Sequence, residues 1–240
     1  MKRLGIVLVL AFLPLTASAW TATSDKKIAT KAAALAPPDM RLVINRFESD
    51  YLRGLERARA DEGSDSHRRT QLRAKIERDT KNIAQMIRGK RPMQDVVENL
   101  GMLAHYIADA NNPFHVVPDD ARLAFSYDDY TRYFERRLPK FPTVFYGLDR
   151  HFQLNTYLDK TFARSARFHP LIREEYFRHG SQRTSAEFDD RSTAFGIASV
   201  SYSRSVSDLV NLYYYIWKEA GGDVRSASVM SRGNLLLNAN

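Results

Sequence analysis

The sequence predicts an all-α fold, built as one domain. Apolar residues recur at helical spacing over several long segments, alternating β patterns are scarce, and no internal repeat is evident. The 240 residues are 44% hydrophobic and 11% aromatic, which is typical of a folded globular protein rather than a disordered one. A chain of this length can bury a sizeable core within one domain.

The first 19 residues have the pattern of a secretory signal peptide. A basic MKR start precedes the apolar run LGIVLVLAFLPL and the small-x-small ending TASA. The apolar run is shorter than the roughly 20 residues of a membrane span. We therefore expect cleavage after Ala19 and a secreted or periplasmic protein that begins at Trp20. The domain is then expected over 20–222, followed by a Ser- and Asn-rich, loosely held tail over 223–240.

Helical periodicity identifies the first three long segments of the mature chain. Residues 39–60 and 67–88 each place apolar side chains near helical spacing. Residues 94–110 form a third segment that is more apolar than the others. Because a helix that is apolar on most faces is usually buried, we expect this segment to be central.

Three further segments complete the predicted helices. Residues 127–138 form a short one, and residues 155–178 form a longer one that we expect to be interrupted near Pro170, because proline disfavours helix in the residue before it. Residues 185–222 should hold one long helix or two. The pair Gly221-Gly222 provides a stop signal for the last helix.

Cysteine content and charge restrict the chemistry. The chain has no cysteine, so disulfides and thiolate metal ligands are excluded, and any metal must be bound by His, Asp, Glu or backbone groups. The formal net charge is +8. Such a surplus favours anionic partners such as nucleic acid or phospholipid, although a solvated basic face is also common in proteins without them.

The stretch GMLAHYIADANNPFH contains the most informative residues, His105, Asp109 and His115. Positions i and i+4 of a helix lie on one face, so His105 and Asp109 can point at the same ion. Pro113 ends the helix and lets His115 approach from another direction. The spacing alone also fits a His–Asp hydrogen bond on a helix surface. The apolar neighbours favour the metal site, because ionisable groups are rarely buried unpaired.

The segment LGMLAHYIADANNPFH resembles the signature of zinc-dependent phospholipase C and the related single-strand nucleases. That signature has His, three residues, Asp, five residues and His, with a proline shortly before the last His. The resemblance is specific over 99–116 and patchy over most of 20–222, and the short chain without cysteine is more similar to the phospholipase C branch. In that family the mature protein begins with a tryptophan whose amino and carbonyl groups bind metal, which here corresponds to Trp20.

The resemblance implies a cluster of up to three Zn²⁺ ions in an all-α fold. The candidate ligands are Trp20, Asp25, Asp61, His67, His105, Asp109, His115 and Glu135. The first ion would be bound by His105 and Asp109, together with Asp61 and His67. Asp109 would bridge to a second ion at the Trp20 amino terminus, and His115 would bind the third. Imidazole nitrogen and carboxylate oxygen are ordinary zinc ligands.

Two of the early ligand positions depart from the family pattern. The family has a histidine five residues after the tryptophan, where this chain has Asp25. A carboxylate can still bind zinc, so this ligand is weakened rather than lost. The expected Pro-Asp pair is replaced by Ala60-Asp61, and Asp65 competes with Asp61 as the ligand.

The third metal position departs further. The later helix of the family carries His-x-x-x-Glu; here Glu135 fits the glutamate, but Thr131 stands at the histidine position. Threonine is not a usual zinc ligand. The third ion is therefore expected to be missing, weakly held, or completed by Asp128, Asp129 or His151.

The function implied by the resemblance is zinc-dependent hydrolysis of a phosphodiester. A zinc-bound hydroxide would attack phosphorus, and Asp61 is a candidate base that orients the water. Phospholipid headgroups are the first expectation for the anionic substrate, with peripheral membrane contact, and single-stranded nucleic acid is the second. Because fold does not fix function, the Asp25 and Thr131 departures also fit a metal-binding protein without hydrolytic activity.

Overall fold

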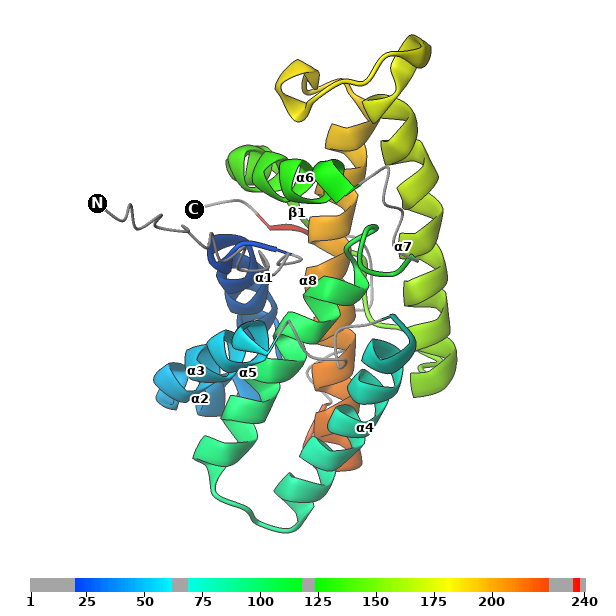
Figure 1. Ribbon diagram of the computed structural model, residues 1–240. Helices are drawn as coiled ribbons and strands as arrows, with labels where there is room; N and C mark the ends of the chain where they lie inside the picture. The colour runs from blue at the N-terminus through cyan, green and yellow to red at the C-terminus, as the bar shows by residue number, and fades with distance from the viewer. Residues whose placement is uncertain (1–19, 62–68, 118–123, 225–234, 238–240) are drawn as a thin grey trace, which may run out of the picture.

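The computed structural model of the chain describes residues 20–61, 69–117, 124–224 and 235–237 (Figure 1). These residues are mostly helical, which confirms the predicted all-α class. The helices are α1 (Ala22–Ala34), α2 (Pro38–Arg46), α3 (Glu48–Ala60), α4 (Arg69–Arg88), α5 (Met93–Ala110), α6 (Ala124–Arg137), α7 (Leu154–Tyr176) and α8 (Thr193–Glu219). Short 3-10 turns occur at Leu138–Lys140, Arg178–Gly180 and Ser185–Glu187.

Helices α5 and α8 organise the core. In Figure 1, α8 runs through the middle of the molecule, α7 lies along one side of it and α5 crosses it. Helices α1, α4, α5 and α7 all pack against α8, and α3 and α4 pack against α5. Helix α5 is buried along most of its length, from Val96 to Ala110, which confirms the prediction that this segment is central.

Glycines allow α5 to lie directly against α3. A Cβ atom added at Gly54 would lie 1.9 Å from the carbonyl oxygen of Glu98, and one added at Gly101 would lie 2.0 Å from that of Tyr51. Both distances are far below van der Waals contact, so the two backbones approach more closely than any other residue would permit. This contact fixes the position of α5 one turn before His105.

Two helix boundaries differ from those predicted. The segment 39–60 is divided at Phe47, which separates α2 from α3. Helix α7 continues through Pro170, so the predicted interruption is wrong. A proline removes only one backbone hydrogen bond, and the buried residues Ile172 and Tyr176 beyond it hold the last turns of the helix against the core.

The segment 185–222 contains a single long α-helix, which is one of the two predicted possibilities. Helix α8 begins after Ser192, whose side chain accepts a hydrogen bond from the Phe195 backbone N–H. It ends at Glu219, and Gly221 adopts a positive φ of 84°. That backbone conformation favours glycine, as the stop signal requires.

The structure also contains a small β-sheet that the sequence did not predict. Strand β1 (Thr143–Phe145) pairs antiparallel with β2 (Leu235–Leu237). Three residues of the tail expected to be loosely held are therefore strand-paired, because the backbone groups of β1 provide hydrogen-bonding partners. The expected signal peptide, residues 1–19, lies outside the described residues.

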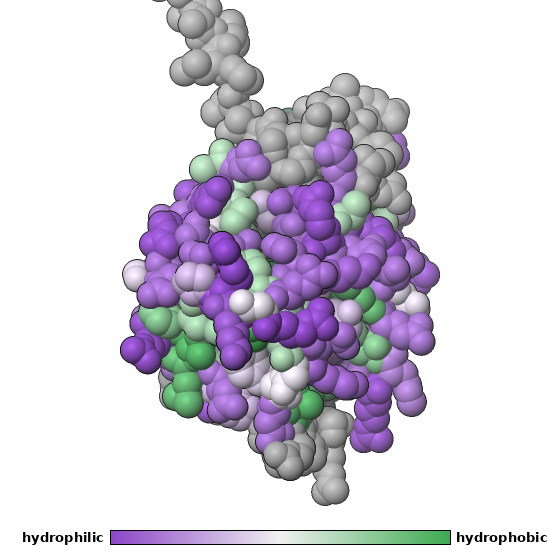
Figure 2. Space-filling model, turned by 90° about the horizontal axis from the view of Figure 1, so that it is seen from below, coloured by the Kyte–Doolittle hydropathy of each residue, from purple (hydrophilic) through white to green (hydrophobic). Residues whose placement is uncertain are grey.

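The face shown in Figure 2 is largely hydrophilic, with hydrophobic residues in small separate patches. None of the helices in the described ranges has both the length and the apolar composition of a membrane span.

Candidate metal centre

Four polar side chains meet at the C-terminal end of α5, in the interior of the molecule. We call Asp25, His105, Asp109 and His115 the His/Asp cluster. The side chains of the first three have no exposed surface, and His115 is 11% exposed. His105 Nδ1 lies 2.8 Å from Asp25 Oδ2, while His105 Nε2 and His115 Nε2 lie 3.4 and 3.5 Å from Asp109 Oδ2. The structure thus brings together four of the eight predicted ligands.

The turn after α5 brings His115 back to the helix end. Asn112 makes this turn: its side-chain oxygen accepts a hydrogen bond from the Phe114 backbone N–H, and its carbonyl accepts one from the His115 backbone N–H. The Tyr127 hydroxyl lies 2.7 Å from His115 Nδ1, which leaves Nε2 directed at Asp109. Tyr127 lies 12 residues from His115, and no spacing rule points to it.

Burial and neighbouring charges act together on the carboxylates of the cluster. Burial raises the pKa of Asp25, and the nearby Asp109 carboxylate adds to this rise; His105 and Arg59 oppose it. A neutral imidazole has one N–H, so His105 cannot donate to Asp25 and Asp109 together unless it is protonated. The cluster therefore places two carboxylates in a dry environment, where a cation would be stabilising.

Two separations within the cluster have the length expected between zinc ligands. The separations of 3.4 and 3.5 Å are longer than a normal hydrogen bond. They match the distance of about 3.4 Å between two ligands of one tetrahedral zinc with bonds of about 2.0–2.2 Å. Asp25 binds His105 through Nδ1, in the way that a carboxylate commonly orients a metal-binding histidine.

Asp25 has one more oxygen that supports this interpretation. Its Oδ1 atom is buried and has no hydrogen-bond partner among the described residues, so an ion or a proton would satisfy it. Within those same ranges, no three His, Asp or Glu side chains converge on one point. The cluster is instead a chain of contacts, Asp25–His105–Asp109–His115.

Trp20 lies beside the cluster and is completely buried. Its indole Nε1 donates a hydrogen bond of 2.8 Å to the carbonyl of Ala108, the residue before Asp109, and its ring centroid lies 3.9 Å from that of Phe134. The side chain thus anchors the start of the described chain between α5 and α6. Metal binding by the Trp20 amino and carbonyl groups stays a prediction.

Asp61 and His67 belong to the segment that follows α3. Asp61 is exposed. Its charge contributes to raising the pKa of Tyr106 on α5, which indicates that Asp61 lies near this helix. His67 and the competing Asp65 lie outside the described residues. The two predicted ligands of this segment therefore stay predictions.

The residues predicted for the third metal are placed on or near α6. Glu135 is half-buried, and within the described part of the chain it makes no hydrogen bond or ion pair with the His/Asp cluster. Asp129 accepts hydrogen bonds from Tyr176 and Ser185, so its carboxylate is used in holding a loop. Asp128 and His151 are exposed.

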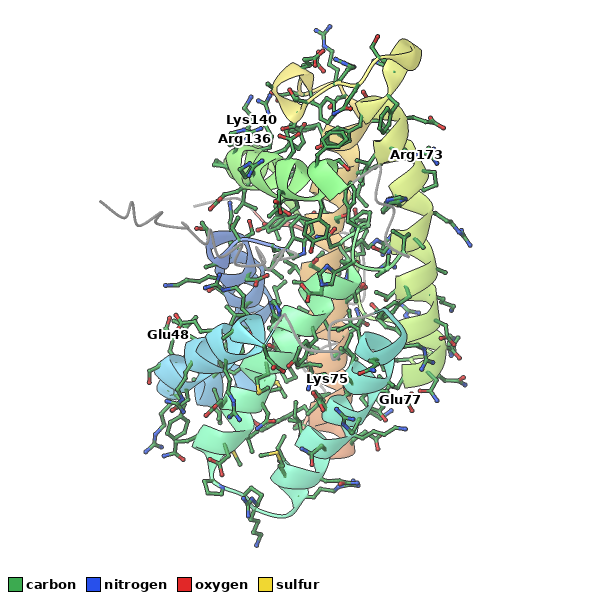
Figure 3. All side chains as sticks on the ribbon, in the orientation of Figure 1. Glu48, Lys75, Glu77, Arg136, Lys140 and Arg173 are labelled. Atoms are coloured by element: carbon green, nitrogen blue, oxygen red, sulfur yellow. The ribbon has the colours of Figure 1, made fainter. Side chains whose placement is uncertain are left out.

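Charged residues outside the cluster are mostly peripheral. In Figure 3 the labelled Glu48, Arg136, Lys140 and Arg173 lie at the edges of the molecule, and all four are exposed. Lys75 extends from α4 over the Tyr106 ring of α5, at 4.5 Å from its centroid.

A groove between α1 and α3 reaches Asp25. It has a volume of about 420 Å³, and its lining includes Asp25, Lys26, Lys27, Leu52, Leu55 and Arg59. The groove thus joins cationic and apolar side chains with the acidic Asp25 and Glu56 at one end of the cluster. Arg59 is not among the residues that the sequence indicates, since no local pattern links it to Asp25.

Comparison with known proteins identifies no relative: no family model, curated protein or solved structure matches the chain.

Proposed function

We propose that the chain is a secreted zinc-dependent phosphoesterase that hydrolyses a phosphodiester in the manner of phospholipase C. The observation that carries the proposal is the buried His/Asp cluster, in which two imidazoles face one carboxylate oxygen at zinc-ligand separations. His105, Asp109 and His115 would bind the metal directly. Trp20, Asp61, His67 and Glu135 are the further ligands that the sequence proposes.

The chemistry assigns a task to each part of the site. Bound zinc lowers the pKa of a water to about 7 and neutralises charge on the phosphate oxygens. Asp25 holds the His105 ring in one orientation and one tautomer through Nδ1. Asp61, at the end of α3, would accept a proton and orient the attacking water.

The groove beside Asp25 supports a phospholipid substrate. Lys26 and Arg59 would bind the phosphate, because a guanidinium matches phosphate oxygens in charge and geometry. Leu52 and Leu55 offer apolar surface for the remainder of the molecule. No aromatic side chain is among the described residues that line this groove, whereas sites for single-stranded nucleic acid usually stack bases on aromatic rings.

The test is metal-dependent turnover of a defined substrate panel. Protein beginning at Trp20 would be assayed with p-nitrophenyl phosphorylcholine, a phosphatidylcholine vesicle and a single-stranded oligonucleotide. We expect hydrolysis of the choline esters, loss of activity on chelation and recovery with zinc. His105→Ala should be inactive. Turnover that persists after chelation would contradict the proposal.

Arg59 provides a sharper test of the groove. Arg59→Gln should lower kcat/KM for the choline ester about tenfold, the effect of losing one charge-assisted interaction with phosphate. Arg46→Gln removes the same charge from an exposed position on α2 and should change kcat/KM less than about twofold. Zinc binding without any turnover would support the alternative, a metal-binding protein that does not hydrolyse.

A further inference from the structure

A second pocket lies between α7, α8 and the loop that follows β1. Its volume is about 230 Å³. Its cationic side chains are Lys160 and Arg164 from α7 and Arg204 from α8, and Tyr146 and Tyr157 provide aromatic walls. None of these residues belongs to the His/Asp cluster or to the groove at Asp25.

Arg204 is the unusual member of this pocket. Its guanidinium carbon lies 3.6 Å from the centroid of the Tyr146 ring, so the planar group is stacked on the aromatic face. Among the described residues, Arg204 donates no hydrogen bond and forms no ion pair, and its Nε is buried without a partner. A stacked guanidinium keeps its in-plane N–H donors available for an anion.

Arg164 is held in place by a buried network. Asp208, 1% exposed, accepts hydrogen bonds from Arg164, Asn111, Tyr157 and Thr161. This network uses the Nη2 atom of Arg164. The pairing fixes the guanidinium in position while part of its donor capacity remains.

The loop that closes the pocket is fixed to α8. The Ser207 hydroxyl accepts a hydrogen bond from the Tyr146 backbone N–H, and Asn211 accepts one from Asp149 and donates one to the carbonyl of Gly147. These contacts make the site rigid before any ligand binds, which lowers the cost of binding.

The charge of the pocket indicates the ligand. Three cations from two helices surround the space, and they outnumber the Asp149 carboxylate at the rim and the Asp208 carboxylate beneath. Cationic side chains form charge-assisted hydrogen bonds to phosphate oxygens, so three of them lining one space suit a tetrahedral dianion. We propose that this pocket binds a phosphate group, as inorganic phosphate or a small phosphate monoester, with Arg204 as the principal contact.

The experiment is calorimetric titration of the full mature chain with sodium phosphate in dilute chloride buffer at neutral pH. Arg204→Gln should weaken binding about tenfold, as expected for one charge-assisted contact. Arg167→Gln is the matched control, because Arg167 is exposed one turn beyond Arg164 and does not line the pocket. It should change affinity less than about twofold.

Two further variants keep the result independent of folding. Lys160 and Asp149 are exposed, so changes at either should leave the fold intact. Lys160→Gln should weaken phosphate binding, whereas Asp149→Asn should strengthen it about two- to threefold by removing the opposing charge. Equal affinities for Arg204→Gln and Arg167→Gln, or no response at Asp149, would overturn the proposal.

A last arm separates this pocket from the proposed metal centre. His105→Ala should abolish any phosphate bound through a metal and leave binding at the pocket unchanged. If His105→Ala removes all phosphate binding, the pocket proposal is wrong and the metal-centre proposal stands. Repeating the titration with glycerol phosphate shows whether the pocket prefers the free ion or an ester; tighter binding of either supports the site.

Discussion

Two buried carboxylate sites lie at the same end of α5, and their chemistry differs. Asp208 accepts hydrogen bonds from four side chains, and the Arg164 guanidinium compensates its charge. In the His/Asp cluster, Asp25 and Asp109 face two histidines, and Asp25 Oδ1 has no partner among the described residues. Asn111 donates to Asp208 only two residues after Asp109.

We interpret Asp208 as a structural carboxylate and the carboxylates of the His/Asp cluster as ligands of a cation. A buried charge is tolerated when it is paired and fully hydrogen-bonded, as Asp208 is. Such a site gains nothing from a cation. In the His/Asp cluster, two buried carboxylates face two titratable imidazoles, so a bound cation would stabilise the carboxylates. The same helix end therefore carries one site that stabilises the fold and one that we interpret as functional.

The largest effect is expected from a substitution that displaces α5, the helix whose end carries both carboxylate sites. Gly101→Ala places a Cβ atom 2.0 Å from the Tyr51 carbonyl oxygen, so α5 must move away from α3. We expect a loss of about 4 kcal/mol in the free energy of unfolding, or failure to fold. Urea denaturation would measure it. Gly196→Ala, in α8 with nothing within 4 Å, should stabilise by up to about 1 kcal/mol; equal effects at the two glycines would contradict the proposed contact.

Removing the structural carboxylate should be the next largest effect. Asp208→Ala leaves the partly buried Arg164 and three other donors without their acceptor. We expect the free energy of unfolding to fall by about 3 kcal/mol. Asp159→Ala breaks an exposed pair with Arg73 and should cost less than about 1 kcal/mol. A small effect at Asp208 would mean that the network does not stabilise the fold.

Zinc should stabilise the chain through the His/Asp cluster alone. At a free zinc concentration one hundred times Kd, we expect the free energy of unfolding to rise by about 2.7 kcal/mol. The Asp208→Asn variant should keep this increment, and His105→Ala should lose it. Urea denaturation with and without a chelator measures both. An increment that survives in His105→Ala would place the metal elsewhere.

The smallest effect is expected at Asp25, where a substitution should raise the stability of the fold rather than lower it as at Asp208. Asp25→Asn removes a buried charge while its amide oxygen can still accept from His105. Because burial raises the pKa of Asp25, the stability contributed by that carboxyl is present in full below its ordinary pKa of about 3.9 and is lost as the pH rises through the folded-state value. In chelator at pH 7, we expect Asp25→Asn to raise Tm by about 2–4 °C.

The control for this prediction is the pH itself. Below about pH 3 the carboxyl of Asp25 is protonated in both the folded and unfolded chains, so the difference in Tm should vanish. The same variant should bind zinc more weakly at neutral pH, because His105 loses its charged partner. A Tm that falls at pH 7 would show that Asp25 is a structural carboxylate like Asp208.

Local patterns were sufficient for much of the fold and part of the site. Helical periodicity predicted the long helices, and the buried segment 94–110 proved central. The i to i+4 spacing of His105 and Asp109, followed by Pro113, predicted that the three residues of the signature would meet, as they do. These features depend on residues close together in the chain.

Contacts between distant segments were not predictable in this way. Asp208 and Arg164 are 44 residues apart, and neither lies in a pattern that indicates an ion pair. The same holds for Arg59 beside Asp25 and for the pairing of β2 with β1. Such contacts follow from how the helices pack, and single-chain periodicity does not encode that packing.

The most direct test of the central claim is the zinc content of protein that begins at Trp20, by elemental analysis after exhaustive dialysis, beside His105→Ala and Asp208→Asn. If the His/Asp cluster is a metal centre, the unaltered chain and Asp208→Asn should each retain at least two zinc ions, and His105→Ala should retain fewer. An unaltered chain without zinc, or His105→Ala with undiminished zinc, would contradict it.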